Sequence, residues 1–145
     1  MSSNAEVIMQ QQQPAMPVSI MSGQNAQQLL EQISDWGSMT TIVIHGGSVF
    51  EFTGPFPKAT VAEGFYNLKA DGNGFHGHLN LQKVEQISFQ TKPHRGRESY
   101  AFVFEDANGD VIFKVFLGRD EKGELIASQR EKFYQLMQQY QQALK

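Results

Sequence analysis

Residues 64–79, GFYNLKADGNGFHGHL, decide the fold class of this chain. Two runs in which polar and apolar residues alternate, Gly64–Lys69 and Gly74–Leu81, lie on either side of the tetrapeptide Asp-Gly-Asn-Gly at 71–74. Gly and Asn readily adopt the positive φ angles that tight hairpin turns require. The stretch therefore predicts two antiparallel strands joined by a short turn.

The same period of two continues on both sides of this hairpin, from Thr40 to Gly118. It predicts five more strands: Thr40–His45, Ser48–Thr53, Val84–Thr91, Glu98–Glu105 and Asp110–Leu117. The turn sequences His-Gly-Gly at 45–47 and Asp-Ala-Asn-Gly at 106–109 fit hairpins. Pro93 is expected to end the strand before it.

Helical periodicity occurs only outside this strand region. Asn25 is the expected N-cap of a helix over 26–36, which ends at Gly37. A second amphipathic helix is expected from about Glu121 to Leu144. The predicted fold class is therefore α+β, a large antiparallel sheet with flanking N- and C-terminal helices. Two helices are too few to cover a large sheet, which indicates dimerisation through a sheet face or edge.

The 145 residues are expected to form one folded domain, 24–145, after a flexible Gln-rich tail, 1–23. Four apolar residues of the tail offer the alternative that it docks: Ile8, Val18, Ile20 and Met21. The net charge of −3 argues against a nucleic-acid partner or a membrane-binding basic face. No apolar run reaches the roughly 18 residues of a spanning helix. A signal peptide is not expected, which fits the cytoplasm, as does the absence of cysteine.

Three groups of residues are candidates for a binding site. His76 and His78 are spaced to share one face of a strand, where they would ligate a metal or haem iron, or simply face solvent. Tyr66 is either a core tyrosine or an anionic iron ligand. The one basic cluster, suited to carboxylate or phosphate or else a solvated loop, is Lys92, His94, Arg95 and Arg97. No motif of a known catalytic site occurs.

Five short strings, in order, resemble the ChuX/HutX family of intracellular haem carriers. They are WGSMTT (36–41), GFYNL (64–68), GHL (77–79), GRES (96–99) and FLGRD (116–120), and the resemblance covers about residues 29–140. It implies a fold like one half of a HemS-type haem-trafficking protein, and a homodimer. The implied activity is to bind haem in the cytoplasm for iron acquisition, as in Gram-negative bacteria that scavenge host haem, and to pass it to a haem-degrading enzyme.

The resemblance also implies which residues hold the haem. His78 in GHL and Tyr66 in GFYNL match positions linked to haem, so ferric haem is expected on either residue, or on both across a dimer-related pocket. Arg95, Arg97 or Lys92 would then approach the propionates. His45 is one residue beyond the matching position of a second family histidine, so it is expected to point to the opposite sheet face.

Two other functions remain open from the sequence. One is a haem-degrading, oxygenase-like enzyme, and the other is a dimeric protein-interaction module that binds no haem.

Overall fold

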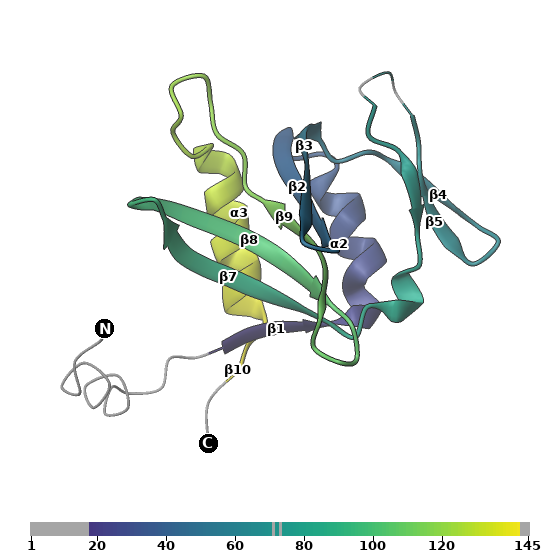
Figure 1. Ribbon diagram of the computed structural model, residues 1–145. Coiled ribbons are helices and arrows are strands. Elements are labelled where there is room, and N and C mark those ends of the chain that lie inside the picture. Colours follow the sequence, from purple (N-terminus) through teal and green to yellow (C-terminus); the bar gives the residue numbers. More distant parts are fainter. Residues whose placement is uncertain (1–17, 71, 73, 143–145) are drawn as a thin grey trace.

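The computed structural model describes residues 18–70, 72 and 74–142, which form two antiparallel sheets and two α-helices (Figure 1). The larger sheet has seven strands in the order β10-β1-β7-β8-β9-β2-β3. In chain order these are β1 (Val18–Ser22), β2 (Ser38–His45), β3 (Ser48–Pro55), β7 (Gln86–His94), β8 (Arg97–Glu105), β9 (Val111–Phe116) and β10 (Gln141–Gln142). The smaller sheet has three strands, β4 (Ala59–Ala62), β5 (Phe65–Leu68) and β6 (Gly77–Leu79). The α+β prediction is confirmed.

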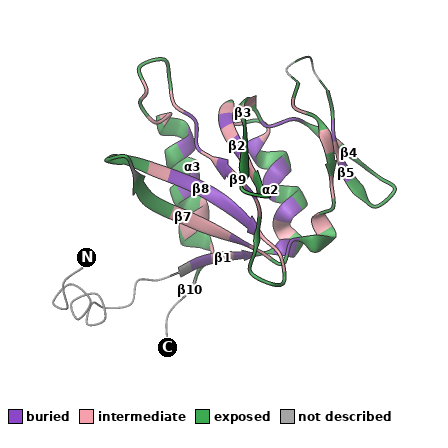
Figure 2. Ribbon diagram, in the orientation of Figure 1, coloured by how far each residue is buried: buried purple, intermediate pink, exposed green. Residues whose placement is uncertain are grey.

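Both helices, α2 (Ala26–Ile33) and α3 (Ala127–Gln139), lie on one face of the large sheet, here called the helix face (Figure 1). Phe102 of β8 is fully buried there. The centroid of its ring is 4.9 Å from that of Phe133 on α3 and 5.8 Å from that of Trp36 after α2. Such aromatic contacts carry much of a core's stability. Figure 2 shows that β8 is buried along most of its length, while its end at the turn to β7 is exposed.

The opposite face of the large sheet, here called the open face, is covered by neither helix. Side chains alternate along a strand, so residues paired across strands share a face. Ile42 of β2 pairs with Glu51 of β3 and Lys114 of β9, which places all three on the open face. Ile44 and Val49 on the same face remain 47% and 58% exposed. The expected shortage of helices is therefore real, because one face of the sheet lacks a helical cover.

The predicted tail, residues 1–23, needs a correction at its end. Residues 18–22 form β1, which pairs with β7 and β10. Met21 is 2% exposed, so this short segment buries enough apolar surface to be ordered. The possible docking of Ile20 and Met21 is thus observed, whereas Ile8 and the rest of residues 1–17 lie outside the described residues.

The C-terminal helix begins six residues later than its periodicity suggested. Asp120 accepts hydrogen bonds from the backbone N–H groups of Lys122 and Glu124, at 2.9 and 3.0 Å, and Gly123 has φ +81°. This side-chain-capped turn competes with helix formation, so α3 starts only at Ala127. Pro93 does not end its strand, because β7 continues to His94 and Pro93 pairs with Glu98 near the hairpin turn.

One buried glutamine joins α3 to two connections of the chain. The Nε2 of Gln129 donates to the carbonyls of Trp36 and Ser38, at 2.8 and 2.9 Å, and its Oε1 accepts from the N–H of Gly118 at 2.7 Å. Gly118 packs so closely on Ser38 that an added Cβ would lie 1.9 Å from the Ser38 carbonyl oxygen. The strings WGSMTT and FLGRD therefore meet at this contact.

Candidate functional site

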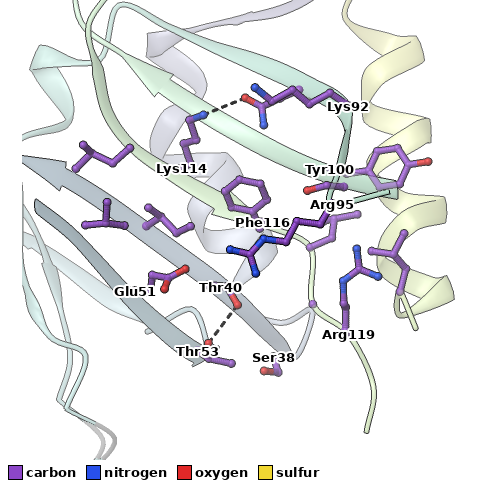
Figure 3. Close-up of a pocket in the computed structure, with 18 residues that line it drawn as sticks. Ser38, Thr40, Glu51, Thr53, Lys92, Arg95, Tyr100, Lys114, Phe116 and Arg119 are labelled. Atoms are coloured by element: carbon purple, nitrogen blue, oxygen red, sulfur yellow. Dashed lines mark hydrogen bonds between the residues drawn. The ribbon is translucent and has the colours of Figure 1, made fainter. Parts of the chain in front are cut away.

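A groove of about 790 Å³ lies on the open face of the large sheet (Figure 3). Cavities of about 300–1,000 Å³ are the size that small-molecule ligands occupy. Its apolar floor comes from Ile42, Ile44, Val49 and Phe116. Its charged residues are Lys92, Arg95, Lys114, Arg119 and Glu51. Four cations and one carboxylate around an apolar floor suit a ligand that is largely apolar and carries negative charge.

Lys114 is the cation whose surroundings favour an anion most clearly. It is half-buried, and its Nζ donates to the Oε1 of Gln90 at 3.1 Å. Burial lowers the pKa of Lys114, and the nearby Lys92 lowers it further, against an opposing effect of Glu105. A carboxylate beside Lys114 would stabilise its charged form.

The predicted basic cluster is divided by the structure. Lys92 and Arg95 line the groove, and Arg95 reaches over Thr40 and Phe116 from the β7–β8 turn, where its φ is +53° (Figure 3). Arg97 instead donates through Nη2 to the carbonyl of Gly123 at 2.8 Å, and it is not among the groove residues. The side chain of His94 lies outside the described residues.

His78 lies on β6 of the small sheet, with its side chain exposed. Its Nδ1 is 2.6 Å from the Oδ1 of Asn67 on β5, directly across the strand pair. The ring of Phe65 meets the imidazole edge-on, with centroids 6.1 Å apart. The imidazole is therefore held on one side and open on the other. Histidine of this kind is a common ligand of haem iron.

Tyr66 lies on β5 and points to the face of the small sheet opposite to that of His78. It pairs with Leu79, whereas its neighbour Asn67 pairs with His78, so Tyr66 and His78 face opposite ways. Tyr66 is only 3% exposed, and burial, followed by the charge of Glu31 on α2, raises the pKa of its hydroxyl. One chain in this arrangement does not present both predicted ligands to one iron.

His78 is also far from the basic end of the groove. The pocket at His78, of about 340 Å³, includes Asp106 and shares no lining residue with the groove. Lys92 pairs with Ser99, at one end of β8. Ser99 and Asp106 are seven residues apart, which corresponds to roughly 23 Å along an extended strand. Of the other histidines, His76 precedes β6, and His45 follows Ile44 on β2, so the groove receives Ile44 and not His45.

Sequence reasoning missed two residues at these sites. Lys114 is the one polar residue in the strand VIFKVF, and this interruption of an apolar run was the available signal. Asn67 lies inside the string GFYNL, but only the fold shows that it contacts His78. Among residues 18–70, 72 and 74–142, no three His, Asp or Glu side chains gather to hold a bare metal ion. No helix in that part of the chain has the length and apolarity to cross a membrane.

Comparisons with known proteins agree with this architecture. The family model described as haem utilisation ChuX/HutX matches residues 19–136. The intracellular haem transport protein HutX of Vibrio cholerae is 44% identical over 129 residues, 89% of this chain and 67% of that protein. A crystal structure of an Erwinia carotovora protein superposes with a TM-score of 0.81 at 30% identity, over 88% of this chain and 79% of that one.

A larger protein contains the same fold as part of its chain. ChuS, a haem oxygenase of E. coli, superposes with a TM-score of 0.72 at 19% identity, over 94% of this chain but only 45% of its own. The expected likeness to half of a larger haem protein is thus confirmed for the fold. The family model matches most of the described residues, and the relative from Vibrio cholerae is 44% identical. The chain therefore belongs to the ChuX/HutX family of haem utilisation proteins.

Proposed function

We propose that this protein binds haem in the cytoplasm and passes it on, as a carrier in haem uptake for iron acquisition. The observation that carries the proposal is His78, an exposed imidazole held through Nδ1. An exposed ligand suits transfer, because an acceptor can approach the iron from outside. Support comes from the family description and from the relative named as an intracellular haem transport protein. The proposed receiver is a haem-degrading enzyme.

His78 is the proposed iron ligand in preference to Tyr66. Tyrosine binds ferric iron as tyrosinate, and the raised pKa of buried Tyr66 opposes that form. A neutral imidazole needs no such ionisation near neutral pH. The degrading-enzyme alternative has less support, because ChuS shares only 19% identity and therefore supports the fold alone.

The groove is the proposed site of the propionates. Haem is a flat apolar ring with two carboxylates, which matches an apolar floor beside Lys92, Arg95 and Lys114. Arg97 is left out of this proposal because it is turned toward Gly123. Since His78 lies far from these cations in one chain, we propose a homodimer in which one haem meets His78 of one copy and the groove of the other. The exposed Ile44 and Val49 on the open face favour such pairing.

The first test is a titration of the apoprotein with haemin, followed by absorbance from the Soret to the visible bands. We expect a saturable Soret shift at about one haem per subunit. His78→Ala should lower the haemin affinity strongly. The matched control His76→Ala, which replaces another exposed histidine, should bind haemin like the wild type. No shift beyond that of free haemin would refute the carrier proposal and favour a protein-interaction module.

The shared site has its own test. The variants His78→Ala and Lys92→Ala/Arg95→Ala are each expected to bind haemin weakly when pure. Co-refolded in equal amounts, they should form mixed dimers in which about a quarter of all sites have both halves intact. Recovery of tight binding at about that level supports the shared site, whereas no recovery refutes it.

Handover is tested with haem-loaded protein and the apo form of a haem-degrading enzyme. Transfer that is faster than the spontaneous loss of haem to a scavenger supports a direct handover. Equal rates contradict it.

A further inference from the structure

Asn67 lies across from His78 and has its side-chain orientation fixed by the backbone around it. Its Nδ2 is 3.2 Å from the carbonyl oxygens of Thr60 and Ala62, and 3.3 Å from that of Phe65. Carbonyl oxygens only accept hydrogen bonds, so the group that faces them must be the NH₂. The amide oxygen Oδ1 therefore faces His78, and a flipped amide would place an oxygen against three oxygens.

This orientation determines where the proton of His78 lies. The Nδ1 of His78 is 2.6 Å from Oδ1 of Asn67, and an amide oxygen cannot donate. Nδ1 must therefore carry a hydrogen. In the neutral imidazole the other nitrogen, Nε2, then has its lone pair free. The edge-on ring of Phe65, at 69° to the imidazole plane, limits rotation of the same side chain.

We infer that Asn67 is a positioning residue that holds neutral His78 as the Nδ1–H tautomer and so presents Nε2 as the ligand for haem iron. The ligand part of this inference rests on the proposed haem binding. The tautomer part does not, because it follows from contacts within the free protein. When the ring nitrogen that does not bind the metal donates a hydrogen bond, the ring is fixed in place and the metal-binding nitrogen becomes more basic, which strengthens the bond to a metal.

The apoprotein tests the tautomer directly. Two-bond ¹H–¹⁵N spectra at about pH 8 distinguish protonated from unprotonated ring nitrogens, and His78→Gln assigns the signals. We expect Nδ1–H in the wild type. Asn67→Val removes the acceptor while keeping a residue that favours strands, and it should give a mixture of tautomers. Nε2–H in the wild type, or no change in Asn67→Val, overturns the inference.

Haemin binding tests the consequence. Asn67→Val should bind about 10–100-fold more weakly than the wild type, the usual cost of losing such a partner. Asn108→Ala, an exposed asparagine in the β8–β9 turn, is the matched control and should bind normally. The iron–histidine stretching band of the ferrous complex should fall in frequency in Asn67→Val relative to the wild type. A purely structural role of Asn67 would not move this band.

The outcomes separate this inference from the proposed function. If His78→Ala loses haemin and Asn67→Val binds like the wild type with an unchanged band, the inference is overturned and haem binding through His78 stands. If His78→Ala binds like the wild type, haem binding through His78 is wrong, and so is the ligand role inferred here.

Discussion

Replacing Gln129 by leucine tests whether this buried side chain joins α3 to the rest of the fold. The change removes three hydrogen bonds and leaves the carbonyls of Trp36 and Ser38 and the N–H of Gly118 without that partner. Gln129 is 0% exposed, so water replaces these bonds poorly. Each buried polar group left without a hydrogen-bond partner costs about 1–3 kcal/mol, and burial of the apolar leucine offsets part of that cost. We therefore expect the free energy of unfolding to fall by about 3–4 kcal/mol.

Urea unfolding followed by circular dichroism measures this loss as a lower midpoint with an unchanged slope. Gln135→Leu, at an exposed position of the same helix, is the control and should change stability by less than about 0.5 kcal/mol. A second variant, Gln129→Glu, keeps the acceptor but turns the other oxygen toward two carbonyls, so its carboxyl pKa should lie above the usual value. Its stability should then fall as pH rises through about 4.3 and above. If Gln129→Leu unfolds within about 1 kcal/mol of the wild type, the account of this contact is wrong.

Three further predictions follow from particular contacts. Gly118→Ala should lower stability by more than about 3 kcal/mol because its Cβ would lie 1.9 Å from the Ser38 oxygen, while thermal unfolding of Gly77→Ala, with nothing within 4 Å, should stay near the wild type. Burial and the hydrogen bond to Tyr134 raise the pKa of Tyr100 to about 12, so stability should fall as pH rises from about 10 to 12. In an ultraviolet titration, Tyr100 of the Tyr134→Phe variant should ionise at a lower pH than in the wild type. Lys114→Met should unfold at a slightly higher temperature, since it removes a poorly solvated cation, yet bind haemin more weakly, and normal haemin affinity would contradict its proposed contact with a propionate.

Most of the fold could be predicted because its signals are local. The seven predicted strands all occur, and the N-terminal helix begins where the apolar spacing of Leu29, Leu30 and Ile33 indicated. The three strands that were missed are short or weakly patterned: β1 is VSIMS, β4 is ATVA and β10 has two residues. The strand character of β1 and β10 comes from partners elsewhere in the chain, such as Gln86–Ser88 for β1, and a local pattern does not contain that information. The strand β4 pairs with the next strand, β5, and was missed because ATVA is too short to show a period of two.

The candidate site was only half predictable for a related reason. Alternation along GFYNL and GHL already places Tyr66 and Asn67 on opposite faces, but the register of β5 with β6 decides that Asn67 and not Tyr66 meets His78. The basic cluster shows the same limit. Lys92 and Arg95 reach the groove, whereas Arg97 is drawn away by the carbonyl of Gly123, a residue 26 positions later in the chain.

A carrier must release its haem as well as bind it, and the arrangement of the two sites bears on both. A ligand as deeply buried as Tyr66 would hold iron where no acceptor reaches it, since its exposed fraction is 3%. His78 is exposed, so an iron held by this proposed ligand would remain accessible to a ligand of the acceptor. The proposed contacts of the ring and the propionates belong to a different sheet, and in the proposed dimer to a different copy. In that proposed arrangement the affinity would be divided between two sites on two copies, and separating the copies would release the haem without breaking one strong site.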